Sequence, residues 1–174
     1  PDQTFEMPKS LVEISGLTLQ HNKQKLCAVQ DENGLLFEID KHTGKVSEGI
    51  KFYKDGDYEG IECVGKTIYV IKSTGTIYEL KKTPADTFSI TKYKSFLNKE
   101  HDVEGLGYDE KNNRLLLGCK GKGKKVKKEH DHDEEHHHDP FEKEIFAFDL
   151  QTKKVMSTPA FKINRKAIQT FLDA

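Results

Sequence analysis

The sequence repeats one short motif at a regular interval. Each copy has an acidic residue, any residue, Ser or Glu, then Gly and an aliphatic residue. The three copies lie at residues 13–19 (EISGLTL), 57–63 (DYEGIEC) and 102–108 (DVEGLGY). Their glycines, Gly16, Gly60 and Gly105, are separated by 44 and 45 residues. A period of this length indicates that one supersecondary unit recurs along the chain.

Each motif is followed by two short apolar runs. In the second repeat these are TIYVI at residues 67–71 and TIYEL at residues 76–80, and equivalent runs follow the other two motifs. The runs are rich in Val, Ile, Leu, Phe and Tyr and are bounded by polar turns, so they are predicted strands rather than helices. Candidates for a fourth strand are more polar, as expected of an outer edge that faces solvent, and lie at residues 50–54, 89–94 and 155–161.

Four-stranded units of about 45 residues are typical of propeller blades. The sequence therefore predicts an all-β fold, a β-propeller of four-stranded antiparallel blades in a single domain. The alternative is a β-sandwich whose turns happen to recur. The expected boundaries are 11–54 for blade 1, 55–100 for blade 2, 101–161 for blade 3 with an insertion loop at 120–143, and 162–174 for the start of the next blade.

Three blades and the start of a fourth do not close a ring, since propellers have about four to eight blades. Two explanations stay open. Further blades follow in a longer protein, or two copies pair as a homodimer to complete the ring.

The composition excludes two kinds of partner. The chain has 28 Lys and Arg against 29 Asp and Glu in 174 residues, a net charge of -1, so no global field draws it to nucleic acid. No apolar run is long enough for a transmembrane helix. Cys27, Cys63 and Cys119 are odd in number and lack CxxC spacing, so we expect buried free thiols rather than a disulfide set or a zinc site. The alternative is a nucleophilic or redox cysteine, although each lies in or beside an apolar run and none has a neighbouring His.

Together, the residues 11–40, 57–80 and 102–119 resemble the SdiA-regulated family of bacterial envelope proteins, which is related to phytase-like and NHL-repeat propellers. The resemblance rests on the E-I-S-G and D-x-E-G-[IL] elements and spans roughly residues 10–160. It implies a six-bladed propeller exported to the periplasm or cell envelope, without an established catalytic activity. The Lys- and His-rich insertion departs from the family pattern.

The acidic residues of the motif form the first candidate site. Rotation about a propeller axis brings equivalent positions to one level, so Glu13, Asp57 and Asp102 form one level and Ser15, Glu59 and Glu104 another. Residues two apart lie on the same face of a strand. Carboxylates gathered in this way suit Ca²⁺, and the predicted ligands are Glu13, Asp57, Glu59, Asp102 and Glu104. Alternatively, the acids accept backbone N–H groups or pair with Lys, or they form a catalytic carboxylate set.

The insertion holds the second candidate site. Its histidines, surrounded by Asp and Glu, are a predicted transition-metal site: His130, His132, His136, His137 and His138. The alternative is a solvated loop that binds no specific ligand.

No nucleophile and base occur at a recognisable spacing, so we assign no catalytic residue. The leading hypothesis is a non-enzymatic, exported propeller that binds a small molecule or a protein at its channel face, with Ca²⁺ ordering the acidic residues. The competing hypothesis is a metal-dependent phosphoester or lactone hydrolase. A third is transition-metal binding by the His-rich loop.

Overall fold

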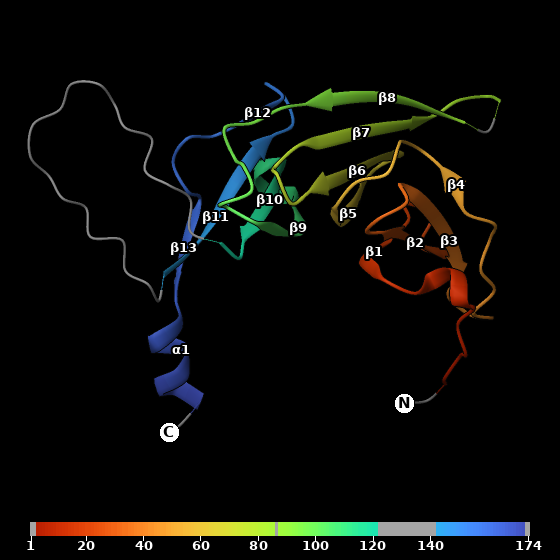
Figure 1. Cartoon of the computed structure of the whole chain (residues 1–174), viewed down its shortest axis with the longest axis horizontal. Coiled ribbons are helices and arrows are strands. Elements are labelled where there is room, and N and C mark those ends of the chain that lie inside the picture. Colours follow the sequence, from red (N-terminus) through yellow and green to blue (C-terminus); the bar gives the residue numbers. More distant parts are fainter. Residues whose placement is uncertain (1–2, 86, 122–141, 173–174) are drawn as a thin grey trace, which may run out of the picture.

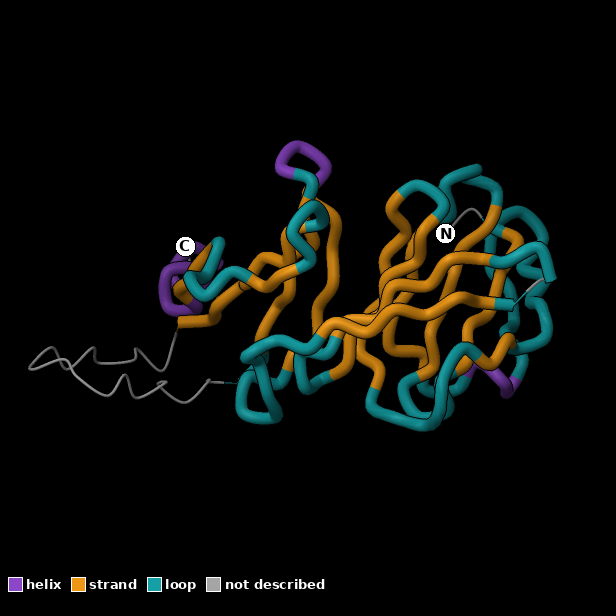
Figure 2. The backbone as a smooth tube through the Cα atoms, turned by 90° about the horizontal axis from the view of Figure 1, so that it is seen from above, coloured by secondary structure: helices purple, strands orange, loops and turns teal. Residues whose placement is uncertain are grey.

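The computed structural model describes residues 3–85, 87–121 and 142–172. Three antiparallel sheets follow one another in chain order, and Figure 1 shows their first strands on the inner side of the arrangement. Seen from above, the sheets succeed each other across the molecule (Figure 2). The predicted all-β fold of four-stranded blades is confirmed.

Blades 1 and 2 are four-stranded meanders. Blade 1 contains β1 (Ile14–Leu19), β2 (Lys25–Gln30), β3 (Leu35–Asp40) and β4 (Ile50–Lys51), preceded by a 3-10 turn, η1 (Lys9–Leu11). Blade 2 contains β5 (Tyr58–Val64), β6 (Thr67–Lys72), β7 (Ile77–Lys82) and β8 (Phe88–Tyr93). The fourth strands are the predicted outer strands, although β4 is only two residues long.

Blade 3 has an extra strand. It contains β9 (Val103–Asp109), a 3-10 turn η2 (Glu110–Asn112), β10 (Arg114–Cys119), β11 (Glu142–Asp149), β12 (Lys154–Val155) and β13 (Phe161–Asn164). Both β12 and β13 pair with β11. Residues 162–164, which we expected to begin a further blade, thus extend the sheet of blade 3. The helix α1 (Arg165–Leu172) follows, fully exposed and directed away from the sheets (Figure 1).

The repeated glycines occupy the same place in each blade. Gly16 pairs with Val29, Gly60 with Ile71 and Gly105 with Gly118, always between the first and second strands. A β-bulge immediately precedes the glycine in all three blades. The rotational equivalence predicted from the 45-residue period is therefore present in the backbone register.

Gly16 and Gly60 are required because neighbouring inner strands approach closely there. A Cβ atom on Gly16 would lie 2.7 Å from the backbone nitrogen of Ile61, and one on Gly60 would lie 2.8 Å from the Cβ of Leu106. Both contacts join one blade to the next. Glycine thus sets the spacing of the inner strands, which is the place where the motif residues meet.

Apolar side chains fill the spaces between the blades. One buried cluster joins blades 1 and 2 and includes Val29, Phe52, Tyr58 and Leu80. A second cluster joins blades 2 and 3 and is made of other side chains, among them Ile71, Ile77, Val103, Leu115 and Phe148. Within the described ranges, no helix is long and apolar enough to cross a membrane.

Candidate functional site

The first residue of each motif lies just before an inner strand and binds backbone in the same way in all three blades. Its carbonyl oxygen accepts a hydrogen bond from the residue that follows the second strand. The pairs are Asp31 N–H to Glu13 at 3.2 Å, Ser73 N–H to Asp57 at 3.1 Å and Lys120 N–H to Asp102 at 2.8 Å. The backbone at the first motif position therefore makes the same connection at the start of each blade.

Further backbone hydrogen bonds connect the blades at the same end. The carbonyl oxygen of Asp31 accepts from the N–H of Tyr58 at 2.8 Å, and that of Ser73 accepts from the N–H of Val103 at 2.9 Å. Because each bond joins the end of one blade's second strand to the start of the next blade, the motif ends of the three blades are held side by side.

The middle residues of the motif occupy the β-bulges. Ser15, Glu59 and Glu104 have no partner in the register of the second strand, whereas the residues on either side of each do. A bulge interrupts the alternation of side chains and redirects the extra residue. The simple argument that residues two apart share a face therefore does not hold at these positions. No sequence pattern indicated the bulges.

The structure brings some of the predicted carboxylates together around Glu59. Burial raises the pKa of Glu59 to about 7, assisted by a hydrogen bond with Asp57 and by the negative charges of Asp57, Glu104 and Asp31. Asp57 also accepts a hydrogen bond from the hydroxyl of Ser73. We call Asp31, Asp57, Glu59 and Glu104 the acidic cluster.

Asp31 belongs to the acidic cluster but was missed by the sequence analysis. Its Oδ1 atom is enclosed and has no hydrogen-bond partner in the described part of the chain. Asp31 holds the position that Ser73 and Lys120 hold in the other blades. The repeat alone marks that position, but nothing in the sequence shows that the charge of Asp31 acts on Glu59.

One lysine partly compensates the acidic cluster. The Nζ atom of Lys120 lies 2.7 Å from Oε1 of Glu104, and both side chains are largely exposed. The hydrogen bond to Glu104, together with the charges of Glu104, Asp102 and Glu59, raises the pKa of Lys120. This pair matches the alternative in which motif acids pair with Lys.

The remaining predicted ligands are less closely connected. Asp102 acts on its surroundings through its charge, which helps to raise the pKa of Cys119 after the larger contributions of burial and Glu144. Glu13 is exposed, and its side chain makes no hydrogen bond or ion pair with the described residues. In the parts of the chain that the structure describes, no three His, Cys, Asp or Glu side chains are arranged to hold a metal ion. The predicted loop ligands, His130, His132, His136, His137 and His138, lie outside the described residues.

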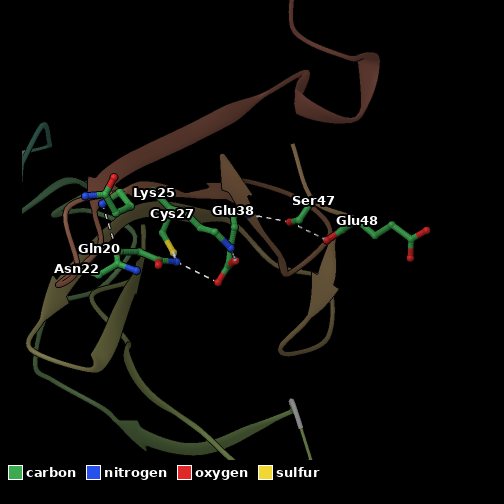
Figure 3. Close-up of polar contacts among 8 residues, drawn as sticks. Gln20, Asn22, Lys25, Cys27, Glu38, Ser47 and Glu48 are labelled. Carbon is green, nitrogen blue, oxygen red and sulfur yellow. Dashed lines mark hydrogen bonds and ion pairs between the residues drawn. The ribbon is translucent and has the colours of Figure 1, made fainter. Parts of the chain in front are cut away.

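A pocket of about 450 Å³ lies between blades 1 and 2 at the opposite end of the inner strands. Gln20 and Lys25, on either side of the β1–β2 turn, contribute to its wall together with Glu38, Cys63 and Lys66. Burial opposes ionisation of Glu38, but hydrogen bonds from Lys25 and Gln20 outweigh it and lower the pKa of Glu38. These bonds are 2.6 Å from Lys25 Nζ and 3.0 Å from Gln20 Nε2. In Figure 3 the Gln20 amide lies between the Cys27 sulfur and the Glu38 carboxylate.

Residues 5–163 match the SdiA-regulated family. The chain belongs to the SdiA-regulated family. This confirms the resemblance drawn from the motif, and the match extends through all three blades. No curated protein sequence matches the chain.

Solved structures resemble this SdiA-regulated protein in fold. Hydrazine synthase from Kuenenia stuttgartiensis matches with a TM-score of 0.58 at 13% identity, covering 87% of this chain and 37% of that one. The Cps50 (Swd1) β-propeller domain of Myceliophteria thermophila has a TM-score of 0.49 at 12% identity, with 87% and 42% covered. BamB from Moraxella catarrhalis has a TM-score of 0.44 at 15% identity, with 87% and 37% covered. The chain thus spans less than half the length of each.

The three cysteines of this family member are free, as predicted. Cys27 and Cys119 are buried and Cys63 is half-buried. Their spacing in the sequence did not indicate that Cys27 of blade 1 and Cys63 of blade 2 act on each other: the pKa of Cys27 is lowered and that of Cys63 is raised.

A second glutamate of the SdiA-regulated protein is buried between blades 2 and 3. Glu79 on β7 is 3% exposed, accepts a hydrogen bond from the hydroxyl of Tyr69 at 2.8 Å and pairs with Lys153 of blade 3. Lys81 lies 2.8 Å from its other oxygen. Burial raises the pKa of Glu79, but the hydrogen bonds from Lys153, Lys81 and Tyr69 outweigh it and hold the pKa at about 2. This fully paired carboxylate connects the two blades.

Proposed function

We propose that this SdiA-regulated propeller is an exported binding module of the bacterial cell envelope. Its acidic cluster binds a small molecule or protein partner together with a divalent cation, for which Ca²⁺ is the best candidate. The single observation that carries the proposal is the raised pKa of Glu59, about 7, among neighbouring carboxylates. A bound cation would relieve this repulsion.

The donor atoms of the acidic cluster suit a hard cation. Carboxylate oxygens from Asp57, Glu59 and Glu104 come from two adjacent blades, and the enclosed Oδ1 of Asp31 has no described partner. Ca²⁺ takes six to eight oxygen ligands in flexible geometry. In our proposal the side chains adjust on binding: Glu104 exchanges Lys120 for the cation, and Glu59 loses its proton.

Proton release gives the proposal a clear pH dependence. Ca²⁺ requires ionised ligands, so binding competes with protonation of Glu59. Affinity is expected to increase as the pH rises through about 7, the pKa of Glu59. Isothermal titration calorimetry in two buffers of different ionisation enthalpy measures the protons released for each Ca²⁺ bound.

The central test compares wild type with the double variant Glu59→Gln and Glu104→Gln. We expect Ca²⁺ to give binding heat and a higher melting temperature in wild type and neither in the double variant. Glu110→Gln is the matched control, because Glu110 is an exposed glutamate of blade 3 outside the acidic cluster. Identical heats and melting temperatures in wild type and double variant would remove the cation from the proposal.

A carboxylate with a pKa near neutrality is also what a general base requires, which keeps hydrolysis as the competing proposal. Screening phosphoesters and lactones with added Ca²⁺ distinguishes the two functions. Turnover that depends on Glu59 would replace the binding module by a hydrolase, whereas no turnover in both screens supports the binding module.

A further inference from the structure

Cys27 and Cys63 come from different blades but share one apolar cluster. Cys27 lies on β2 of blade 1 and is 2% exposed, and Cys63 lies on β5 of blade 2. Cys63 packs against the same buried cluster to which Cys27 belongs. The proximity of Cys27 and Cys63 therefore depends on how the two blades pack, not on a local sequence motif.

A side-chain hydrogen bond fixes the two strands that carry the thiols. Thr18 of β1 is the register partner of Cys27, and its hydroxyl donates to Oε1 of Glu62 at 2.7 Å. Glu62 precedes Cys63. This bridge between the blades places the neighbours of the two cysteines in contact, and the two thiols are close enough to act on each other: the pKa of Cys27 is lowered and that of Cys63 is raised.

The two sulfurs differ in their access to solvent. Cys63 lines the pocket of about 450 Å³ between the blades, where a small molecule can reach it. Cys27 is buried and does not line the pocket, and its sulfur accepts a hydrogen bond from Nε2 of Gln20 at 3.2 Å (Figure 3). Cys63 is thus the thiol beside an entry path, whereas Cys27 is enclosed in the apolar cluster against which Cys63 packs.

We propose that Cys27 and Cys63 form a reversible disulfide bond that joins blade 1 to blade 2, made by exchange with a small-molecule disulfide that enters through the pocket. The bond would tie together an interface otherwise held by apolar packing and hydrogen bonds. Cys119 is buried in the cluster between blades 2 and 3 and takes no part.

The exchange takes two steps. In the first, the Cys63 sulfur attacks one sulfur of the small disulfide, whose S–S bond breaks; the Cys63 proton leaves and one small thiol departs. In the second, the Cys27 sulfur attacks the Cys63 sulfur, the mixed disulfide breaks and a second small thiol departs with the Cys27 proton. The two protein thiols lose two electrons, and the small disulfide is reduced to two thiols.

Polar neighbours favour Cys27 as the resolving thiol. The interaction with Cys63, and next the hydrogen bond from Gln20, lower the pKa of Cys27 against the opposing effect of burial, whereas the interaction with Cys27 and burial raise the pKa of Cys63. Access through the pocket, not acidity, therefore makes Cys63 the first thiol to react. The Gln20 hydrogen bond does not involve Cys63, so it remains available to the Cys27 thiolate after Cys63 has reacted. Cys119 has no such donor among the residues that the structure describes, and burial raises its pKa to about 11.

The test uses oxidised glutathione on the full, natively folded chain. After incubation, free thiols are blocked with N-ethylmaleimide, and intact mass and non-reducing peptide maps are recorded. We expect a chain that has lost two hydrogen atoms, carries one blocked thiol at Cys119 and yields a linked Cys27–Cys63 peptide. Dithiothreitol is expected to restore all three thiols. A linked peptide that contains Cys119, or no linked peptide at all, would overturn the proposal.

Variants separate the two steps. In Cys27→Ala we expect glutathione to remain attached to Cys63, because no resolving thiol is present. In Cys63→Ala we expect neither a linked peptide nor an adduct, whereas Cys119→Ala is expected to react as wild type does. Circular dichroism confirms that each variant is folded, and the peptide map of the unaltered chain decides the proposal if one is not. A lasting glutathione adduct on wild-type Cys63 would also contradict it.

Discussion

Two glutamates of blade 2 have opposite electrostatic surroundings. Glu79 lies between blades 2 and 3 with Lys153, Lys81 and Tyr69, and its pKa is held at about 2. Glu59 lies in the β-bulge of the inner strand beside other carboxylates, and burial and these neighbours raise its pKa to about 7. Burial opposes ionisation in both cases, so the neighbouring groups decide the direction.

The comparison separates a structural carboxylate from a candidate ligand. The Glu79 carboxylate is paired with two cations, Lys81 and Lys153, and accepts a hydrogen bond from the Tyr69 hydroxyl. Its charge is therefore already neutralised within the chain. The charges that act on Glu59 are instead those of other acidic residues. A protein retains such an arrangement at a cost in stability, which is typical of functional sites.

We expect the largest loss of stability from breaking the contacts of Glu79 with Lys153, Lys81 and Tyr69. Glu79→Gln leaves Lys153 without its carboxylate in a half-buried position, so we expect a loss of about 3 kcal/mol in the free energy of unfolding. Urea denaturation measures it. The matched control is Glu38→Gln, because Glu38 holds the equivalent position in blade 1.

Glu38 pairs with the more exposed Lys25 and with Gln20, so its replacement is expected to cost about 1 kcal/mol. Equal losses in the two variants would contradict the distinction between a buried interface pair and a partly exposed one.

The next largest loss of stability is expected at Gly60, where the inner strands of blades 2 and 3 approach closely. Gly60→Ala places a methyl group 2.8 Å from the Cβ of Leu106 and 3.1 Å from the Cγ2 of Ile71, so we expect a loss of about 2 kcal/mol. Gly107→Ala is the control, since its Cβ would have no atom within 4 Å, and we expect a change below about 0.5 kcal/mol. Denaturation midpoints compare the two. If Gly60→Ala left the free energy of unfolding unchanged, the inner strands of blades 2 and 3 would be able to move apart to admit the methyl group.

The repeated glycines explain how much of the fold could be predicted. Close approach of the next inner strand excludes a side chain at Gly16 and Gly60, and the equivalent place of Gly105 in blade 3 completes a period that is visible in the sequence. The blades and their order followed from it. The electrostatic partners did not, because Glu79 and Lys153 are 74 residues apart and meet only through packing of two blades.

The candidate site was predictable to the same limited extent. The motif indicated that Asp57, Glu59 and Glu104 gather, but not that bulges redirect two of them or that Asp31 joins. Likewise, Cys27 and Cys63 come into one apolar cluster only through blade packing. A local repeat predicts which positions are equivalent, whereas the direction of each side chain depends on the neighbouring blade.

A pH series sharpens the contrast between the two glutamates. The folded-state pKa of Glu79 is below its ordinary value of 4.5, so the stability it contributes is present above pH 4.5 and lost as the pH falls toward 2. The folded-state pKa of Glu59 is above that value, so native protein binds more protons between pH 4.5 and about 7, and stability falls as the pH rises through this range.

The melting temperature of Glu59→Gln is therefore expected to equal that of wild type below pH 4.5 and to be about 3 °C higher than that of wild type at pH 8. Melting temperatures across this range, recorded by circular dichroism, measure the difference. Glu110→Gln serves as the control and is expected to show no such divergence. A constant difference between wild type and Glu59→Gln at all pH values would mean that Glu59 does not titrate near neutrality.

The smallest effect on stability, and the most informative for the acidic cluster, comes from Lys120→Met. The Lys120–Glu104 pair is largely exposed, so its loss is expected to change the free energy of unfolding by less than about 1 kcal/mol. The charge of Lys120 also acts on Glu59, so its removal is expected to raise the pKa of Glu59 further, as carboxyl-carbon NMR titration would record. Lys111→Met, an exposed lysine at the other end of β9, is the control. If Glu104 exchanges Lys120 for a cation, we also expect Lys120→Met to bind Ca²⁺ more tightly than wild type at pH 8, where Glu59 is ionised. Weaker binding would mean that Lys120 is part of the binding site and does not compete with the cation.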